Sequence, residues 1–357
     1  MSYNLRYPVS QKSSYASGDN VDLTLSYPMQ SILGNSVRLS GLLNVFRTGT
    51  THIALTDKIY YDPAVGINNF FNHLVVSSFS KGVLESQSDY PRWIKMKHSA
   101  TRTASQLVSN SRYLTQLMCQ DETTSTVLMT GQMPFSVDLD CCLNNVVDSA
   151  EIPYSKFGDI TISFRIPQAL ESLYGPDMTN AVNFVMSNLA CEYLTIPESK
   201  SPLPTTMRVN YSAKQIINSM NSSINIKLPA VVDRVSASFM KVAEELQLVN
   251  NNVELERPAG ITKLYYTFND STNTFVSYPL ESVEDMLEHY LDSFINDDVK
   301  NGATLRKVCN DELFGIGLNL ESSISLAQTS FGLNILSAIQ TVDPYYIYAY
   351  FKGILSF

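Results

Sequence analysis

The sequence has few of the residues that build disulfide frameworks, sugar-binding platforms or membrane spans. Its 357 residues include five cysteines and one tryptophan. The odd cysteine count and irregular spacing do not match a disulfide framework, so buried free thiols in a reducing compartment are expected. No apolar run approaches the roughly 20 residues that a transmembrane helix needs. The polar N-terminus, Met1 to Asn20, shows no apolar segment of a secretory signal.

Motifs that carry chemistry are also scarce. The four histidines form no His-x-His or His-Glu-x-x-His spacing, which argues against a metal site. There is no Gly-x-Ser-x-Gly elbow, phosphate-binding loop or dinucleotide fingerprint, and Gly315-Ile-Gly317 lacks the third glycine. We therefore predict no catalytic residues, no metal site and no cofactor.

Two acidic and two thiol side chains need separate consideration. Asp138 and Asp140 share one face of a predicted strand, a spacing that can serve acid–base chemistry or calcium binding. Val137 and Leu139 would face inward, and a solvated strand face is the preferred interpretation. The adjacent Cys141 and Cys142 point to opposite faces of a strand, so one thiol is expected to be packed and the other to lie near the surface.

The charge of the chain is acidic, with a net value of −9. Neutralising nucleic-acid phosphates requires clustered Lys and Arg. The N-terminal segment carries only Arg6 and Lys12. We therefore expect no direct binding of nucleic acid.

Strands dominate the predicted secondary structure. Tyr (20) and Phe (16) are abundant, a composition that suits strands. Alternation of apolar and polar residues with period two predicts strands along the whole chain. These are Val21–Tyr27, Ser36–Phe46, Ile53–Tyr61, Phe135–Leu139, Asp159–Ile166, Leu189–Ile196, Ser223–Leu228, Val235–Val242, Ile261–Phe268, Gly315–Leu320, Leu333–Ile339 and Tyr345–Ile354.

Short segments of the first half return in the second half in the same order. Each match is weak alone, but the shared order and the steadily shrinking offset indicate two copies of one β-domain. The pairs are Leu23–Pro28 with Ile224–Pro229, Val83–Ser86 with Pro279–Ser282, Phe135–Asp140 with Phe314–Asn319, and Ser155–Gly158 with Thr329–Gly332.

Two predicted helices occupy equivalent places, one after each Leu-Glu-Ser segment. The first covers Pro91–Ser109, with proline at an acceptable first-turn position. The second covers Ser282–Ile295, where Ser282 and Asp285 resemble a capping signal and the apolar residues form one stripe. Each half is therefore predicted to contain strands, a helix and further strands.

The first helical region is basic and the second is acidic. The pattern describes either two solvated helix faces or two complementary surfaces that meet when copies of the chain assemble. Under the second interpretation, the candidate contacts between subunits are Arg92, Lys95, Lys97, Arg102, Glu284, Asp285, Glu288 and Asp292.

A segment rich in proline divides the chain. Pro197, Pro202 and Pro204 end a strand and favour an extended linker. The predicted organisation is an N-terminal arm (1–19), a first β-sandwich (20–200), a linker (201–206) and a second β-sandwich (207–357). The arm is polar and has amphipathic tyrosines, so we expect it to contact neighbouring subunits or a membrane surface.

The repeat, together with Ile152–Ile162 followed by Asn188–Leu194, resembles the double jelly-roll major capsid proteins of tailless icosahedral viruses. The resemblance covers nearly the whole chain. It implies an all-β fold of two tandem jelly-roll β-sandwiches, each with a short helix. It further implies a structural protein, not an enzyme, that forms trimers of pseudo-hexagonal outline which tile an icosahedral shell.

The resemblance also implies partners and location. The partners would be further copies of the chain in a homotrimer and a capsid lattice, vertex and minor capsid proteins, and, in many family members, an underlying membrane. The protein would be made in the host cytoplasm and reside in the virion. Two alternatives stay open: a minor vertex (penton) capsid protein, and a tandem jelly-roll carbohydrate-active enzyme or binding protein. The single tryptophan, Trp93, lies on a predicted helix and argues against a sugar-stacking platform.

Overall fold

The computed structural model describes most of the chain. The described residues are 4–6, 11–49, 53, 57–62, 64–101, 133–147, 151–200, 202, 204–218, 222–228, 231–258, 260–269, 274–277, 279–294, 314–337 and 343–357. They form three sheets and a few short helices, so the predicted all-β class is confirmed.

The first half contains most of the shorter strands. Its elements are β1 (Asn4–Arg6), β2 (Ser14–Ala16), β3 (Asn20–Leu25), β4 (Gln30–Leu33), β5 (Arg38–Arg47), the 3-10 helix η1 (Gly66–Phe70), β6 (Asn72–Ser78), β7 (Gly82–Gln87), α1 (Tyr90–Thr101), β8 (Met133–Asp138), the 3-10 helix η2 (Cys142–Asn144), β9 (Glu151–Pro153), α3 (Tyr154–Phe157), β10 (Ile160–Arg165), α4 (Ala169–Ser172) and β11 (Val182–Pro197).

The second half repeats a similar series with fewer additions. Its elements are β12 (Thr206–Ile217), β13 (Ser222–Ile226), β14 (Val231–Lys241), the 3-10 helix η4 (Val242–Glu244), β15 (Ile261–Asn269), β16 (Thr274–Val276), α5 (Val283–Asp292), β17 (Ile316–Ser325), β18 (Ser330–Ser337) and β19 (Tyr345–Ser356).

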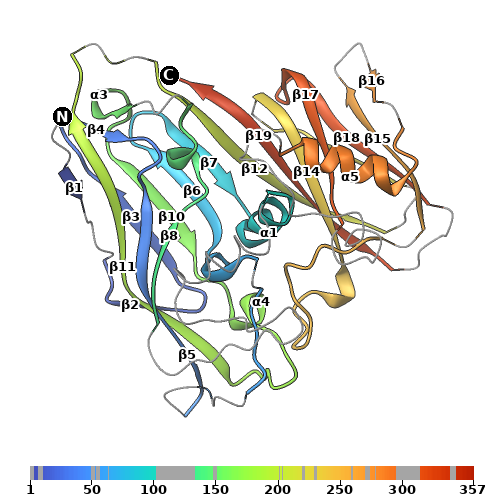
Figure 1. Cartoon of the computed structure of the whole chain (residues 1–357), viewed down its shortest axis with the longest axis horizontal. Coiled ribbons are helices and arrows are strands. Elements are labelled where there is room, and N and C mark those ends of the chain that lie inside the picture. The colour runs from blue at the N-terminus through green and yellow to red at the C-terminus, as the bar shows by residue number, and fades with distance from the viewer. Residues whose placement is uncertain are drawn as a thin grey trace.

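One sheet runs through both halves (Figure 1). Its strand order is β17-β14-β19-β12-β7-β6-β10-β3, so the change from second half to first half falls between β12 and β7. A seven-stranded sheet, ordered β8-β5-β11-β4-β9 with β1 and β2 also on β11, completes the first sandwich. The four-stranded sheet β13-β18-β15-β16 completes the second.

The two halves share their strand order. In the first half β3 lies beside β10, β10 beside β6 and β6 beside β7, while β8, β5 and β11 are neighbours in the other sheet. In the second half β13, β18, β15 and β16 follow the first pattern, and β17, β14 and β19 follow the second. The predicted repeat of one β-domain is therefore present in the topology, with α1 and α5 at equivalent places along the chain.

The register supports one predicted equivalence and corrects another. Leu23 pairs with Ile162 as Ile224 pairs with Leu333, so the first repeated segments occupy equivalent strands. By the same pairing Phe331, opposite Ile226, corresponds to Ile160, opposite Leu25. The paired segments Ser155–Gly158 and Thr329–Gly332 predict that Phe157 and Phe331 are equivalent, and this prediction is wrong, although both rings are buried. Phe157 ends α3 before Gly158 turns the chain at φ 68°, whereas Phe331 lies within β18.

Both predicted helices are present over their described residues. α1 covers the first part of the predicted Pro91–Ser109 helix, and the remainder lies outside the described residues. α5 begins after Ser282, whose Oγ accepts a hydrogen bond from the Asp285 backbone N–H at 3.0 Å. The predicted capping signal at Ser282 is confirmed.

The N-terminal segment belongs to the first sandwich wherever the structure describes it. β1 and β2 pair antiparallel with β11, and Tyr15 of β2 is only 3% exposed. The interpretation of residues 1–19 as a separate arm is therefore wrong for these two segments. The long strand β11 offers an edge whose N–H and C=O groups need partners, and β1 and β2 supply them.

Several strands differ from the sequence expectation. Of the predicted strand Ile53–Tyr61, the described residues form one isolated bridge, between Tyr60 and Tyr174. The alternation pattern also does not predict the strands β1, β2, β4, β6, β7, β9, β12 and β16. β12 lies between β19 and β7, and one of its faces meets both apolar clusters, through Met207 and Val209 at its start and Ile217 at its end. Tertiary surroundings, which local pattern does not contain, decide such cases.

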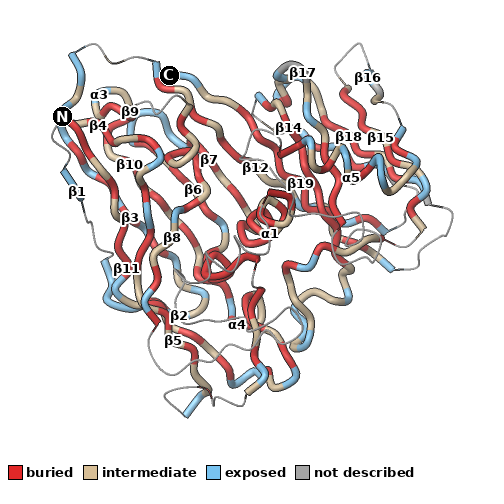
Figure 2. The backbone as a smooth tube through the Cα atoms, viewed as in Figure 1, coloured by how far each residue is buried: buried red, intermediate tan, exposed pale blue. Residues whose placement is uncertain are grey.

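The core consists of two apolar clusters. One fills the first sandwich and extends to Met240, Tyr290, Phe294 and Tyr350 of the second half. The other lies within the second half, around Phe331. Figure 2 shows buried residues along the strands of both halves and along α1. The first cluster therefore joins the halves as well as filling one of them.

Candidate functional site at the seam between the halves

The seam is the line where β7 of the first half meets β12 of the second. Ser86 and Tyr211 pair there in parallel. Beyond the strand, the Ser88 backbone N–H donates to Ser212 Oγ at 2.6 Å, and the two hydroxyls lie 2.8 Å apart. Backbone and side-chain hydrogen bonds therefore join the halves directly.

A buried carboxyl group, Glu85, lies at the centre of this seam. It is 0% exposed. Its Oε1 accepts hydrogen bonds from Gln87 Nε2 at 2.6 Å and from the backbone N–H and Nδ2 of Asn210, both at 3.0 Å. Its Oε2 accepts from the backbone N–H of Cys142. Glu85 thus contacts β7, η2 and β12, and burial raises its pKa to about 7.

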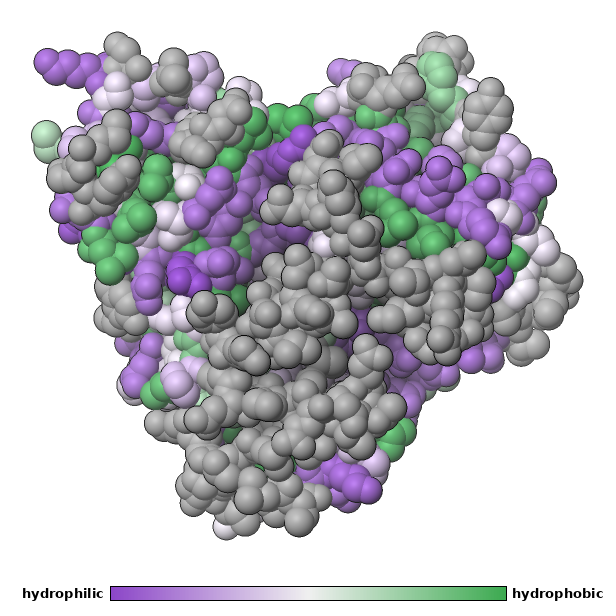
Figure 3. Space-filling model, in the orientation of Figure 1, coloured by the Kyte–Doolittle hydropathy of each residue, from purple (hydrophilic) through white to green (hydrophobic). Residues whose placement is uncertain are grey.

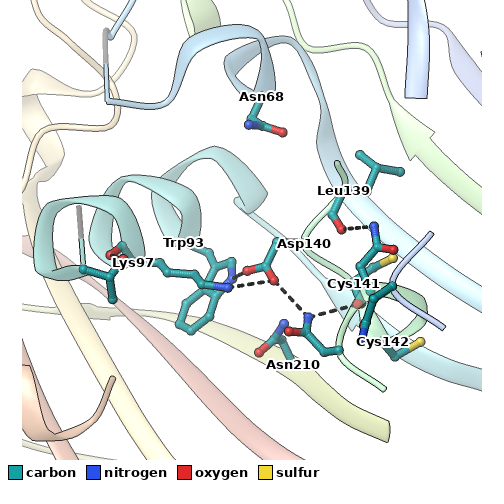
Figure 4. A network of polar contacts seen from close by, with 12 residues as sticks. Asn68, Trp93, Lys97, Leu139, Asp140, Cys141, Cys142 and Asn210 are labelled. Atoms are coloured by element: carbon teal, nitrogen blue, oxygen red, sulfur yellow. Dashed lines mark hydrogen bonds and ion pairs between the residues drawn. The ribbon is translucent and has the colours of Figure 1, made fainter. Parts of the chain in front are cut away.

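A second carboxylate, Asp140, connects the seam to α1 (Figure 4). It accepts hydrogen bonds from Trp93 Nε1 at 2.6 Å, Lys97 Nζ at 3.0 Å and Asn145 Nδ2 at 2.9 Å. Burial by itself would raise the pKa of Asp140, but the charges of Lys97 and Lys352 hold that pKa well below its usual range. Asp140, with a side chain 12% exposed, is therefore a largely buried ion-pair partner and not the solvated strand residue that the sequence predicts.

α1 lies between the two halves and is held by both (Figure 1). Trp93 packs against Phe294 with ring centroids 5.6 Å apart, and against Tyr350 at 5.5 Å. The Tyr290 hydroxyl of α5 donates to the Met96 carbonyl at 2.8 Å. The two equivalent helices therefore meet within one chain, and their contact links the two halves.

The basic candidates for contacts between subunits have partners inside the chain. Arg92 is buried, donates to the carbonyls of Asn252 and Glu254, and stacks over Tyr348. Lys95 pairs with Asp62 at 2.7 Å and Lys97 with Asp140 at 3.0 Å. Arg102 lies outside the described residues. The described basic side chains thus serve the fold of the chain itself.

The acidic candidates lie on the solvent side of α5. Glu284, Asp285, Glu288 and Asp292 are exposed, while Met286 and Tyr290 on the other face are buried. Figure 3 shows hydrophilic side chains over α5 on the visible face of the molecule. Their contact with another copy stays a prediction.

Other residues singled out from the sequence have structural roles. Asp138 is 71% exposed and pairs with Arg38 at 2.8 Å. It therefore lies on a solvated strand face, as the sequence predicts. Cys141 and Cys142 are both buried, so the expectation of one surface thiol is wrong. Both lie in the turn around η2, which packs against the seam, and burial raises the pKa of each thiol. Buried thiols of raised pKa are poor nucleophiles.

The described residues contain no metal cluster and no membrane-spanning helix. No group of three His, Cys, Asp or Glu side chains among them is placed to hold a metal ion. No described helix is long and apolar enough to cross a membrane.

A cavity of about 550 Å³ lies in the second half, away from the seam. Lys241, Glu244, Glu254, Glu256, Arg257, Pro258, Gly260 and Tyr345 line it. Burial and a hydrogen bond with Glu244 raise the pKa of Glu256 to about 7. Lys241 contacts Glu244 at 3.5 Å, so the acidic lining is partly neutralised.

The sequence carries one signal of the seam. Glu85 interrupts the alternation of Val83–Ser86, because Leu84 and Glu85 are consecutive and both buried. The corresponding glutamate of the second Leu-Glu-Ser, Glu281, is exposed and pairs with Lys263 at 2.9 Å. A charged residue at a core position predicts a polar partner nearby, but Asn210 is too distant in sequence to be identified.

Solved structures resemble the chain over almost its whole length. PBCV-1 VP54, fitted into a cryo-EM reconstruction of the virophage Sputnik, gives a TM-score of 0.65 at 10% identity, covering 99% of this chain and 94% of that one. The cryo-EM structure of the Sputnik virophage gives 0.62 at 10% identity, covering 99% and 86%. The Faustovirus major capsid protein gives 0.61 at 9% identity, covering 99% and 90%.

These comparisons establish the fold. No protein-family model matches the sequence, and no curated protein matches it. At such low identity a structural likeness shows architecture alone. The chain has the double jelly-roll fold of viral major capsid proteins, as the sequence resemblance predicted.

Proposed function

We propose that this chain is a major capsid protein that builds an icosahedral viral shell. The observation that supports this most directly is the pair of sandwiches with one strand order in a single chain. It is joined by the near-complete structural likeness to the Faustovirus major capsid protein. A repeated sandwich gives the chain two similar outer surfaces, which a lattice protein can use for similar contacts.

The proposed assembly unit is a homotrimer. Three chains with two sandwiches each place six similar blocks around one axis, which gives a pseudo-hexagonal outline. The seam supports this proposal because Glu85 and α1 each bond to the second half of the same chain and so link its two blocks. Preorganised blocks lose less conformational entropy on assembly.

We further propose that the exposed face of α5 is part of the contact between subunits. We expect the four exposed carboxylates of this face to pair with positively charged side chains of another chain. They are Glu284, Asp285, Glu288 and Asp292. The basic candidates already have partners within their own chain, as seen for Arg92, Lys95 and Lys97. This proposal therefore depends on the acidic face of α5. Exposed ion pairs contribute only about 0–1 kcal/mol each, and they select the correct neighbour more than they strengthen the contact.

The end of the first sandwich near α3 supports a lipid surface as a further partner. Phe79 is 89% exposed at the β6–β7 turn, and Met29 and Val83 are also exposed. Lys81 lies beside them, over the ring of Phe357. Apolar tips beside lysines suit an anionic membrane interface. Vertex and minor capsid proteins, a virion location and synthesis in the host cytoplasm belong to the same proposal.

The alternative functions have less support. A vertex protein with one jelly roll and a different second domain would not need the matched strand order of the two halves. A carbohydrate-binding platform would need an accessible tryptophan, but Trp93 is 3% exposed and packed between Phe294 and Tyr350. The acidic cavity in the second half has Lys241 and Arg257 in its lining, and we infer no catalysis from it.

Particle mass and images test the proposal. We expect the purified protein to be a stable trimer by light scattering, with a six-lobed outline in negative-stain images, and to form shells at high concentration. A monomer at every concentration, with no lattice or shell, would contradict the capsid function.

A further inference from the structure

We propose that the contact between neighbouring copies of this chain repeats the seam between its two halves: the outer edge of β16 in one copy lies beside the outer edge of β1 and β2 in the next. Each edge is therefore covered by a second copy of this chain. The inference rests on the proposed homotrimer, and it names the two surfaces by which its copies meet.

Each strand of the seam has an equivalent strand in the other half. The seam strand β7 is last in the row β3-β10-β6-β7, and β16 is last in the matching row β13-β18-β15-β16. The seam strand β12 runs beside β19, on the edge that faces away from β14. In the first half β11 takes the place of β19, and β5 takes the place of β14. The equivalent of β12 must therefore lie on the edge of β11 that faces away from β5.

β1 and β2 occupy that edge of β11. Val185 of β11 pairs with both Ala16 of β2 and Asn44 of β5, so β2 and β5 lie on opposite edges. β1 lies farther along β11, across from β4. The seam contact between β7 and β12 therefore corresponds to a contact of β16 with β1 and β2.

These two edges are open over the described residues. Among the strands that the structure describes, β16 pairs with β15 alone, and β1 and β2 pair with β11 alone. An edge strand presents unpaired N–H and C=O groups that can pair with another chain. Figure 1 shows β1 and β16 on opposite flanks of the molecule, so they can meet only between copies. Such a head-to-tail contact closes into a ring when its rotation completes one turn.

Both edges carry a large apolar side chain exposed to solvent. Leu5 of β1 is 64% exposed and Phe275 of β16 is 61% exposed. Phe275 lies opposite the buried Phe268, so it extends the apolar face of this sheet to its outermost strand. Large apolar side chains on an open sheet edge favour association. Docking of the neighbouring copy removes both side chains from water.

The charges beside the two edges have opposite signs. Arg6 of β1 is exposed and donates a hydrogen bond to the neutral side chain of Gln30 at 3.1 Å. Lys12, which precedes β2, is 60% exposed and contacts Asp19 at 3.6 Å. The segment that follows β16 leads into α5, whose first turn holds the exposed Glu284. Opposite charges across an interface favour the correct neighbour. Arg6 is therefore a positive counterpart for the acidic face of α5.

Cysteine cross-linking tests which edges meet. A chain that carries both Leu5→Cys and Phe275→Cys, treated with a bismaleimide linker, should give covalent dimers and trimers on a denaturing gel. Each single variant should run as a monomer, because a head-to-tail contact pairs two different positions. Co-expression of the two single variants should give the covalent dimer but no covalent trimer. Wild-type protein under the same treatment measures the contribution of the native cysteines.

Replacement of the same two residues by aspartate gives a second readout. Leu5→Asp and Phe275→Asp should each weaken trimer formation, followed by light scattering, by about 30-fold or more, as expected for a central apolar contact. Val249→Asp, at a loop residue that is 63% exposed, is the matched control and should assemble like the wild type. The melting temperature of the single chain should change little in all three variants, since these side chains are exposed.

The outcomes separate this inference from the proposed function. If the wild type forms trimers, the edge contact is overturned when the double cysteine variant cross-links no more than the wild type and both aspartate variants assemble normally. Cross-linking within either single variant would show that like edges meet, and would also overturn it. In both cases the capsid function stands. A wild type that stays monomeric at every concentration would instead contradict the proposed function, and the edge contact with it.

Discussion

The hydroxyl of Tyr290 donates a hydrogen bond to the backbone carbonyl of Met96 at 2.8 Å, and so joins α5 of the second half to α1 of the first. The two helices hold equivalent places in the repeat, yet they meet each other. The ring of Tyr290 also fills the space beside Gly315, where a Cβ atom would lie 2.4 Å from the ring. Tyr290 thus connects the seam with the second sandwich.

Removing this hydroxyl should loosen the contact between the helices. For Tyr290→Phe we expect a loss of about 1 kcal/mol in the free energy of unfolding, because a buried hydrogen bond is lost while the ring remains. Chemical denaturation measures it. Tyr265→Phe, on the half-exposed face of β15, serves as the matched control and should be close to neutral. An equal effect of both substitutions would show that the Tyr290–Met96 bond has no particular role.

The two buried phenylalanines should both be costly to truncate, although they are not equivalent. Phe157 packs against Phe357 at 5.0 Å, and Phe331 packs against Phe268 and Phe351 at 5.6 and 5.5 Å. We expect Phe157→Ala and Phe331→Ala each to cost about 3–5 kcal/mol through cavity formation. Phe79→Ala, at an exposed turn, is the control and should leave the melting temperature nearly unchanged. Unaltered melting of both core variants would contradict the assigned packing.

Replacing Asp140 should lower the free energy of unfolding more than replacing Asp138, its neighbour on the predicted strand face. Asp140→Asn removes the carboxylate that pairs with Lys97 and accepts from Trp93 and Asn145, and we expect a loss of about 3–5 kcal/mol. Because the pKa of Asp140 is lowered in the fold, its contribution is present at neutral pH and is lost only as pH falls below the usual range of an aspartate. Asp138→Asn, at an exposed pair with Arg38, should change stability by about 0.5 kcal/mol or less. Equal losses in the two variants would contradict the burial of Asp140.

Charge reversal on α5 tests the proposed contact between subunits. Glu284→Lys with Glu288→Lys should leave the melting temperature of the single chain nearly unchanged, since both side chains are exposed. Trimer formation, followed by light scattering, should slow, with the difference shrinking at high salt. Glu192→Lys on β11 is a control away from the helix. Reversal of Lys95 and Lys97 is a poorer test, because it would break their pairs with Asp62 and Asp140.

The sequence alone determined the fold class, the repeat and the second helix. These features are local or periodic: alternation of apolar residues defines strands such as β3 and β10, and Ser282 marks the start of α5 through its own side chain. The order of short matching segments was enough to predict two copies of one domain. The structure shows the same repeat in the strand pairing, because Leu23 lies opposite Ile162 as Ile224 lies opposite Leu333.

Only the tertiary structure decided where the charged and terminal residues lie. Lys95 and Lys97 looked like solvated or subunit-facing residues, because a helix pattern does not reveal that Asp62 and Asp140 reach the same face. The sequence places Tyr15 in a free N-terminal arm, whereas in the structure its strand β2 pairs with the edge of β11. Glu85 is a buried acid because Asn210, which is remote in sequence, supplies two hydrogen bonds to it. Burial and pairing depend on contacts between distant segments, and sequence periodicity carries information about near neighbours only.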